Sequence, residues 1–398
     1  MKVSIYKEPA GTSDGIGGSE LVAALLAESL AVGNQVDLYH RVPSLELDRL
    51  AQNAGANLAG VNLRYVDSNG IPPQVSRNPL RHYQASRDWL AELSKSYDLF
   101  IAIVHGVPPF SHAAKSGLIV LFPTSTAPYT KQEGGLSPEA YRHPAEWIYQ
   151  SWEWKQRMGT YQLKTAISDF SREWTRRRWG IDCEVVHPPV DTEFRRAEKR
   201  PVILSVGRFA TKADGHLKNQ AEMISTFGEL RKQGVTGWEH KSAGGLGNTP
   251  EHQKFFGDLT RLADENGAKL FPNVTREKLK TMYEEASIFW HAAGYGENEN
   301  ARPIFVEHFG ISTVEAMAAG CVPVVIKKGG QREIVEHGVS GFLWDTLEEL
   351  KKYTAELVAD EALRLRMSEA ARARSQLFSR ESFVRNFIGR IKLESASS

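Results

Sequence analysis

Short apolar runs alternate with longer amphipathic stretches along almost the whole chain. The runs are rich in β-branched and aromatic residues, which is typical of strands. In the first half they read VSIY, QVDLYH, NLRYV, LFIAIV, LIVLF and KTAIS, and in the second half PVILSVG, KLFPNV, ASIFWHA and VPVVI.

The stretches between these runs show the three-to-four-residue apolar spacing of amphipathic helices. They predict helices over residues 19–32, 86–96, 219–233, 251–266, 276–285 and 310–319. Alternation of strands and helices indicates parallel sheets joined by right-handed crossovers. The predicted fold class is therefore α/β, with doubly wound sheets.

One segment, His187–Pro201, reads as a boundary between two domains. Its adjacent prolines, Pro188 and Pro189, cannot continue a strand ladder, and a charged run without strand character follows. A new strand begins at Val202, so we expect an N-terminal domain over residues 1–190 and a C-terminal domain over 195–378. A length of 398 residues suits two domains. Ligands of such sheets bind beyond the carboxyl ends of the strands, which for two facing domains means the cleft between them.

Composition excludes several classes of protein. The 49 Lys and Arg nearly balance the 48 Asp and Glu, which argues against nucleic acid as a partner. The two cysteines, Cys183 and Cys321, are too few for a disulfide framework and indicate a reducing compartment. The chain opens directly on a strand, without a charged-then-apolar leader, and has no apolar run of about 18 residues. We therefore expect a cytoplasmic protein.

The segment VEHFGISTVEAMAAGCVPVV carries the strongest chemical signal. Gly310 suits a turn into a helix that Gly320 ends, so the backbone N–H groups of residues 309–313 suit a phosphate. Glu315, about a turn into the helix, and Glu307, before it, can accept hydrogen bonds from sugar hydroxyls. Each acid also has a simpler interpretation: Glu315 as an acid favoured near a helix start, and Glu307 as a solvated loop residue.

Two cations flank a second loop. Arg208 follows the strand VILSVG, and Lys218 precedes the helix predicted from residue 219. An arginine fork and a lysine point charge at one strand end can neutralise a diphosphate, although solvated loop cations are the simpler interpretation.

Two weaker signals lie near the N-terminus. Gly15, Gly17 and Gly18 form a Gly-rich turn, but Glu20 stands where a dinucleotide fingerprint needs glycine, and no Walker motif is present. His105 follows the strand LFIAIV, where ligands are expected, although a lone histidine is more often structural.

Taken together, EHFGISTVEAMAAG, SVGRF, the Gly-rich loop and HPPVDTEF resemble the retaining glycosyltransferases of family 4 over nearly the whole chain. That resemblance implies the GT-B fold of two facing Rossmann-like domains, with a last helix, residues 380–398, crossing back to the first. It implies that Glu315 binds the ribose of a nucleotide-sugar and that Glu307 contacts the donor sugar. It also implies that His105 lies near the reacting carbon.

The resemblance also assigns the remaining donor contacts. Arg208 and Lys218 would hold the diphosphate, with Lys212 as the competing lysine because their loop is longer than in the family. The base would rest on the loop 271–274, and the full donor-binding set is Gly17, Gly18, Arg208, Lys218, Asn273, Val274, Glu307, Phe309, Gly310, Ile311, Ser312 and Glu315.

The function that follows is retaining transfer of a sugar from a nucleotide-diphospho-sugar, UDP-sugar favoured, to a glycan or lipid-linked acceptor in cell-envelope or exopolysaccharide synthesis. A nucleotide-sugar epimerase and a non-catalytic sugar-nucleotide-binding protein are the alternatives; an NAD-dependent oxidoreductase is disfavoured by the missing fingerprint. No cofactor or metal is expected, because the chain has no Asp-x-Asp and its nearest imitation is Glu297-Asn298-Glu299. Residues 147–179 are aromatic and basic, which allows a peripheral contact with the inner face of a membrane or a normally packed helix with a solvated basic face.

Overall fold

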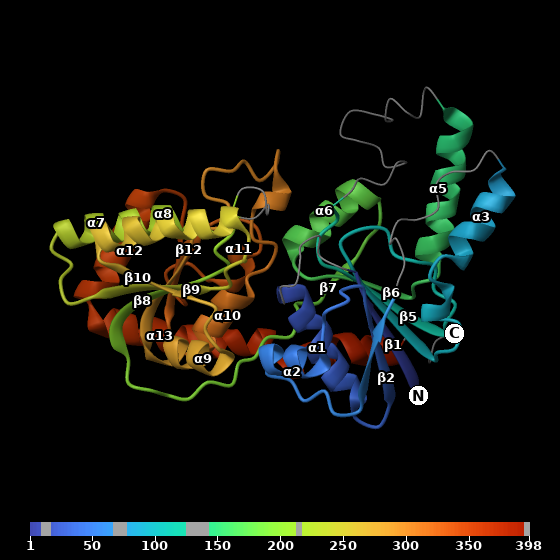
Figure 1. The fold of residues 1–398 in the computed structure, drawn as a ribbon, viewed down its shortest axis with the longest axis horizontal. Coiled ribbons are helices and arrows are strands. Elements are labelled where there is room, and N and C mark those ends of the chain that lie inside the picture. Colours follow the sequence, from blue (N-terminus) through green and yellow to red (C-terminus); the bar gives the residue numbers. More distant parts are fainter. Residues whose placement is uncertain (9–16, 67–77, 125–142, 212–216, 394–398) are drawn as a thin grey trace. The chain divides into compact units, whose positions relative to one another are not determined.

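The computed structural model describes residues 1–8, 17–66, 78–124, 143–211 and 217–393. The chain divides into two compact units, which Figure 1 draws in the colours of the sequence. The N-terminal unit comprises Met1–Pro189 and Phe383–Ser398, and the C-terminal unit comprises Val190–Ser382.

Among the described residues, the N-terminal unit contains a seven-stranded sheet in the order β3-β2-β1-β4-β5-β6-β7. Every neighbouring pair is parallel, as the alternating pattern predicts. The central strand β4 is buried at all its positions, which explains its uninterrupted apolar sequence. The strands are β1 Lys2–Lys7, β2 Gln35–His40, β3 Val61–Tyr65, β4 Leu99–Val104, β5 Lys115–Val120, β6 Leu163–Ala166 and β7 Glu184–Val185.

The helices of this unit are α1 Gly18–Ala31, α2 Leu47–Ala54, α3 Pro79–Asp88, α5 Pro144–Gly159 and α6 Asp169–Trp179, with a 3₁₀ turn at Ala91–Leu93. The prediction of a helix over residues 86–96 was wrong, because the helix observed there, α3, covers Pro79–Asp88. The side chain of Asn78 accepts from the N–H groups of Leu80 and Arg81, and Pro79 occupies the first turn, so the helix starts earlier. It ends before Leu90, whose φ of 56° is left-handed.

The chain returns to the N-terminal unit at its end, through α14 Arg380–Phe383, a π-helical turn at Val384–Ile388 and α15 Gly389–Leu393. Phe387 and Ile391 pack on β5 at Gly117, where a Cβ atom would lie 3.0 Å from Phe387 Cζ and 3.1 Å from Ile391 Cδ1. Glycine at position 117 therefore makes room for the returning segment.

The described part of the C-terminal unit contains a six-stranded parallel sheet in the order β10-β9-β8-β11-β12-β13. Its strands are β8 Arg200–Val206, β9 Glu239–Gly244, β10 Ala268–Pro272, β11 Ala286–His291, β12 Val322–Ile326 and β13 Phe342–Trp344. The structure adds β7, β9 and β13 to the strands that the sequence pattern predicted.

Helices cover both faces of this second sheet, with α7 and α8 on one side and α9, α10 and α13 on the other (Figure 1). Trp290 and Trp344 are buried in its core and donate their indole N–H groups to Thr354 Oγ1 and to the carbonyl of Val324. The helices are α7 Gln220–Lys232, α8 Pro250–Asn266, α9 Arg276–Glu285, α10 Ile311–Ala318, α11 Gln331–Ile334, α12 Leu347–Ala359 and α13 Glu361–Ser375, with 3₁₀ turns at Pro303–Phe305 and Gln376–Phe378.

The chain enters and leaves the C-terminal unit through neighbouring segments. Val190 forms a parallel bridge with Ser379, and its N–H donates to the carbonyl of Phe378 at 3.1 Å. Both ends of the unit are thus held at one place by backbone hydrogen bonds.

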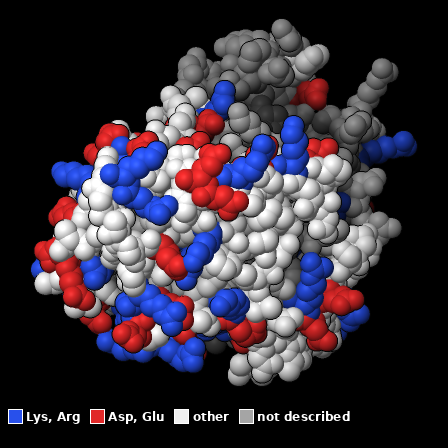
Figure 2. Space-filling model, turned by 60° about the vertical axis from the view of Figure 1, so that its left-hand side comes forward, with Lys and Arg blue, Asp and Glu red and all other residues white. Residues whose placement is uncertain are grey.

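Two surface properties bear on possible partners. Figure 2 shows Lys and Arg side chains mixed with Asp and Glu over the face it presents, rather than gathered in a patch of one sign. In the described part of the chain, no helix has the length and apolar character needed to cross a bilayer.

Candidate functional site

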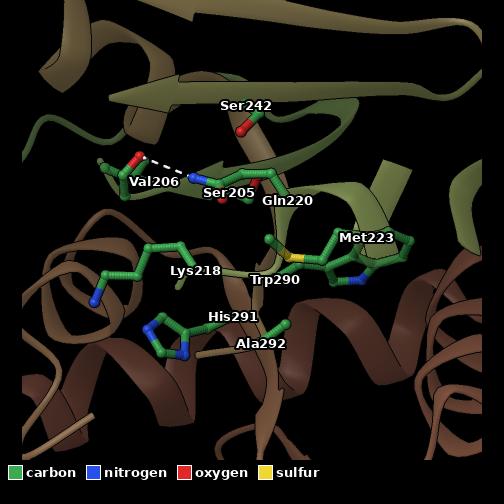
Figure 3. A pocket seen from close by; sticks show the side chains of 10 residues that line it. Ser205, Val206, Lys218, Gln220, Met223, Ser242, Trp290, His291 and Ala292 are labelled. Carbon is green, nitrogen blue, oxygen red and sulfur yellow. Dashed lines mark hydrogen bonds between the residues drawn. The ribbon is translucent and has the colours of Figure 1, made fainter. Parts of the chain in front are cut away.

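Two residues from separate predicted motifs form an ion pair at the carboxyl end of the second sheet. Lys218, just before α7, places its Nζ 2.6 Å from Oε2 of Glu307, in the loop before α10. His291, the last residue of β11, places Nε2 3.2 Å from the same oxygen. Figure 3 shows the side chains of Lys218 and His291 next to each other at one end of the small pocket.

Close packing at the strand end holds Lys218 in place. A Cβ atom at Gly207 would lie 2.8 Å from Lys218 Cγ, so glycine there lets the lysine stem cross the end of β8. Gln220 donates from Nε2 to the carbonyl of Arg208 at 2.9 Å, and Asn219 donates from Nδ2 to the carbonyl of Ala292 at 2.7 Å. The start of α7 is thereby tied to the ends of β8 and β11.

The local charges keep Glu307 ionised. Burial by itself would raise the pKa of Glu307, but the Lys218 ammonium and the His291 hydrogen bond hold it well below its usual range. Burial lowers the pKa of His291, against the attraction of Glu307. A neutral imidazole that donates from Nε2 to an ionised carboxylate fits both directions.

Arg208 lies at the same strand end as Lys218 but stays exposed. Within the described ranges its guanidinium has no recorded acceptor, whereas the neighbouring Phe209 is buried and anchors the loop. The charge of Lys218 is balanced by Glu307, so Arg208 is the cation of this pair that remains uncompensated.

The N-terminus of α10 is the second positive feature. Its N-cap, Gly310, has φ 128° and no capping side chain, and the N–H groups of Ile311 and Ser312 have no recorded acceptor in the described part of the chain. Gly330 lies so close that a Cβ atom there would be 2.5 Å from Phe309 Cα. Free N–H groups at a helix start favour an anion.

Gln331 was not indicated by any sequence signal. Its side chain is fully buried, and neither amide atom has a hydrogen-bond partner among the described residues. A Cβ atom at Gly310 would lie 2.6 Å from its Nε2, so the amide lies against the start of α10.

Glu315 is buried and paired rather than open. Its Oε1 lies 2.5 Å from Nη2 of Arg276, the first residue of α9. The same Nη2 is 3.4 Å from Oδ2 of Asp191, which also accepts from Lys280 Nζ at 3.0 Å. The resemblance named Glu315 but not Arg276, whose contact with it depends on α9 packing against α10, nor Asp191 and Lys280 beside Arg276.

The loop predicted to meet the base is braced by Asn273, which has a φ of 52°. Its Oδ1 accepts from the N–H of Leu246 at 2.8 Å, and its Nδ2 donates to the Leu246 carbonyl at 3.3 Å. Its side chain thus joins the loops after β9 and β10, and the partly buried Val274 follows it.

His105, Gly17 and Gly18 lie in the N-terminal unit, near the carboxyl ends of β4 and β1. Oε2 of Glu8 accepts from the backbone N–H groups of His105 and Gly106, both at 2.7 Å. Burial lowers the pKa of His105 from 6.5 to about 4, helped by the charge of Lys7, so its ring is neutral.

Gly17 is the N-cap of α1, and its N–H donates to Oε2 of Glu20 at 2.9 Å. Glu20 also pairs with the buried Lys7 at the end of β1. Glu8, Lys7 and Glu20 were missed from the sequence, although the first two directly follow a predicted strand. Gly15 and Lys212 lie outside the described residues.

No group of three or more acidic, histidine or cysteine side chains suited to a metal ion occurs among the described residues. Both acids of the Glu297-Asn298-Glu299 segment are paired with arginines. Glu297 lies 3.5 Å from Arg302, and Glu299 lies 2.8 Å from Arg332. Metal independence stays a prediction.

The aromatic and basic region of residues 147–179 forms a groove of about 510 Å³. Trp154 donates its indole N–H to the carbonyl of Trp179, and the two rings, both lining this groove, pack edge to face. Its lining residues are Trp147, Ser151, Trp154, Lys155, Met158, Gly159, Lys164, Arg176, Arg177, Trp179, Gly180 and Ile181.

Comparison with known proteins matches part of the chain to a described family. Residues 190–374 match the family described as glycosyl transferases group 1. The chain is 27% identical to a Dictyostelium discoideum GDP-Man:Man(3)GlcNAc(2)-PP-Dol alpha-1,2-mannosyltransferase over 242 residues, 57% of this chain and 46% of that protein. It is 35% identical to the human alpha-1,3/1,6-mannosyltransferase ALG2 over 286 residues, 64% of this chain and 62% of that protein. The chain spans about half the length of the first curated relatives it matches.

Solved structures share the fold over the whole chain. A glycosyltransferase from Rickettsia africae has a TM-score of 0.69 at 15% identity and covers 100% of both chains. HepE of Anabaena in complex with UDP has a TM-score of 0.62 at 16% identity, over 98% of this chain and 100% of the other. At these identities the likeness establishes the two-domain α/β fold, which is the predicted GT-B class.

Proposed function

From the premise that residues 190–374 belong to the group 1 glycosyltransferases, in a chain with the GT-B fold, we propose that this protein transfers a sugar from a nucleoside diphosphate-sugar to a glycan or lipid-linked glycan. The transfer retains the configuration of the sugar, as the resemblance to family 4 implies. The observation that carries the proposal is the ion pair of Lys218 and Glu307 beside the uncapped start of α10.

In the proposed reaction the protein stabilises the charge that develops on the departing diphosphate. Arg208 supplies an exposed guanidinium with no acceptor among the described residues, and Lys218 has two further N–H donors beyond the one given to Glu307. The N–H groups of Ile311 and Ser312 add the positive end of α10. Glu307, held ionised, accepts from the donor sugar, and the glycosyl centre, oxocarbenium-like, is attacked by the acceptor on the face that the diphosphate leaves.

The N-terminal unit supplies the acceptor side in this proposal, with His105 near the reacting carbon and Gly17 and Gly18 beside the donor. A lipid-linked glycan is supported by the names of the curated relatives, which act on Man(3)GlcNAc(2)-PP-Dol. We place the reaction in the cytoplasm, in synthesis of an envelope or exported polysaccharide, with the groove of residues 147–179 as the surface for a peripheral membrane contact.

The base of the donor has two candidates. The resemblance favours a UDP-sugar, whereas the curated mannosyltransferases are named for GDP-mannose. UDP-sugars and GDP-sugars are therefore the first donors to test. The proposed reaction uses no metal cofactor.

A donor screen tests the proposal. Thermal unfolding of the full chain should shift upward with one of UDP, GDP or ADP, and the matching sugar nucleotide should release its nucleoside diphosphate in the presence of a glycan acceptor. Release that needs no acceptor and yields an isomerised sugar would indicate an epimerase instead. Binding without turnover over all donors and acceptors would leave a sugar-nucleotide-binding protein.

A further inference from the structure

Four charged side chains form a buried cluster where α9 meets α10 in the C-terminal unit. Arg276 and Lys280 supply two positive charges, and Asp191 and Glu315 supply two negative charges. The side chains of Asp191, Arg276 and Glu315 are 9%, 11% and 7% exposed. The cluster is neutral as a whole, which is the condition under which charges persist away from water.

Arg276 has the central place in this cluster. Its Nη2 contacts both acids, at 2.5 Å from Glu315 Oε1 and 3.4 Å from Asp191 Oδ2. Asp191 is itself fixed from two more sides, because Oδ1 accepts from the N–H of Glu193 at 3.0 Å and Oδ2 from Lys280 Nζ. Arg276 is therefore held by Asp191, an acid outside the candidate site, as well as by Glu315.

Glu315 depends on this arginine for its orientation. Oε1 of the carboxylate lies 2.5 Å from Arg276 Nη2, and this contact constrains the direction of the group. A carboxylate in this state can accept hydrogen bonds from a pair of neighbouring hydroxyl groups, and acceptors that are charged bind hydroxyls more strongly than neutral ones. Without a cation at this depth, an ionised Glu315 would be an uncompensated buried charge.

We propose that Arg276 is the positioning residue for ribose recognition: held by Asp191, it orients the Glu315 carboxylate toward the ribose hydroxyls of the donor. The inference rests on the proposed function, since it takes Glu315 as the ribose contact. It assigns roles to Arg276 and Asp191, which lie outside the motif that contains Glu315.

Lys280 provides a matched control in the same cluster. It lies one helical turn after Arg276 on α9 and contacts Asp191, but it has no recorded contact with Glu315. Loss of Lys280 removes one positive charge from the cluster, as loss of Arg276 does, yet leaves the contact between Arg276 and Glu315. A general weakening of the cluster would affect both variants, whereas the positioning role belongs to Arg276 alone.

The experiment compares ribose and deoxyribose ligands on the full chain. Calorimetric titration measures the affinity of the wild type, Arg276→Gln, Arg276→Lys and Lys280→Gln for UDP and 2′-deoxy-UDP, and for GDP and 2′-deoxy-GDP. The wild type should prefer the ribose form about tenfold or more, the scale of one hydrogen bond to a charged group. Arg276→Gln should reduce that preference below about threefold, and Lys280→Gln should retain it.

The outcomes separate the two levels of the argument. If the wild type binds no nucleoside diphosphate, the proposed function fails and this inference fails with it. If it binds but does not distinguish the sugars, or if Arg276→Gln keeps the full preference, Arg276 is not a positioning residue while the proposed function stands. Should Arg276→Gln fail to fold, Arg276→Lys decides: lysine keeps the charge without the planar fork, so a reduced preference supports the role and a full preference overturns it.

Discussion

The ammonium of Lys218 lies 2.6 Å from the carboxylate of Glu307, although 89 positions separate the two residues in the chain. Each residue was expected to meet a different part of the donor, the lysine the diphosphate and the glutamate the sugar. Their contact makes the pair neutral and constrains both side chains. Five predictions follow from this arrangement and from the groups around it.

Glu307→Gln should lower turnover about 100-fold, the scale of one preorganised electrostatic contact, while nucleoside diphosphate affinity stays within about threefold of wild type. The amide cannot neutralise Lys218, so the freed ammonium keeps or strengthens its hold on the diphosphate. Steady-state kinetics and calorimetry measure the two effects. The exposed acid Glu348 gives the control, Glu348→Gln. An equal loss of turnover and affinity would make Glu307 a nucleotide or structural residue.

Glu315→Ala should weaken nucleoside diphosphate binding about 10- to 100-fold, because hydrogen bonds to charged groups contribute roughly 1.5–3 kcal/mol. It also leaves Arg276 with Asp191 alone, so some stability should be lost. Calorimetry checks the affinity, and circular dichroism checks the fold. Unchanged affinity in a folded variant would remove the ribose role.

Arg208→Ala should reduce turnover about 100-fold or more, since Arg208 is an exposed cation at the end of β8 with no acceptor in the described part of the chain. Because the side chain is exposed, the melting temperature should hardly change. Arg261→Ala is the matched control, as Arg261 is 77% exposed on α8 and pairs only with the nearby Asp258. Comparable losses in both variants would point to a general charge effect rather than to a diphosphate contact.

Activity should survive excess EDTA. Arg208 and the start of α10 place positive charge beside the neutral pair of Lys218 and Glu307, so an added cation would be repelled. Turnover with and without chelator is the measurement. Loss of activity that magnesium or manganese restores would contradict both the metal independence and the phosphate roles of the two cations.

His240 should make the protein less stable in mild acid. Burial lowers its pKa from 6.5 to about 3, so the folded state keeps the imidazole neutral while the unfolded chain takes up a proton below pH 6.5. Stability therefore falls as pH drops from 6.5 toward 3, by about 2 kcal/mol between pH 7 and pH 5. Urea unfolding at both pH values, compared with His240→Phe, measures it, and equal pH dependence in both proteins would refute the assignment.

Most of the architecture was accessible from the sequence because apolar periodicity reports burial directly. Strands such as LFIAIV and ASIFWHA lie in sheet centres and are apolar almost throughout. Strand β9 was not predicted because its sequence, EHKSAG, carries polar residues. His240 and Ser242 of this strand are nevertheless buried. His240 forms a hydrogen bond with Ser205 on the neighbouring strand. Such a pair is set by sheet order, which local pattern does not contain.

The candidate site likewise contains residues that the sequence indicated and residues that only tertiary packing brings to it. Glu307 and Glu315 stand out because they flank the start of a predicted helix, and Arg208 and Lys218 because they flank the loop after a predicted strand. Arg276 and Asp191 do not, because the contact between them requires α9 to pack next to the segment after Pro189. Gln331 likewise carries no local signal, since only tertiary packing leaves its amide buried without partners.

The hydrogen bond between Val190 and Phe378 has a consequence for how this chain can be divided. The C-terminal unit is an insertion into the N-terminal one, and its first residue, Val190, forms a backbone bridge with Ser379, three residues before its last. A unit whose ends coincide can be excised or exchanged as a cassette, with a short linker rejoining the host chain at residues 189 and 383. If the proposed function holds, exchanging this unit between related chains would change the donor while both sheets stay intact.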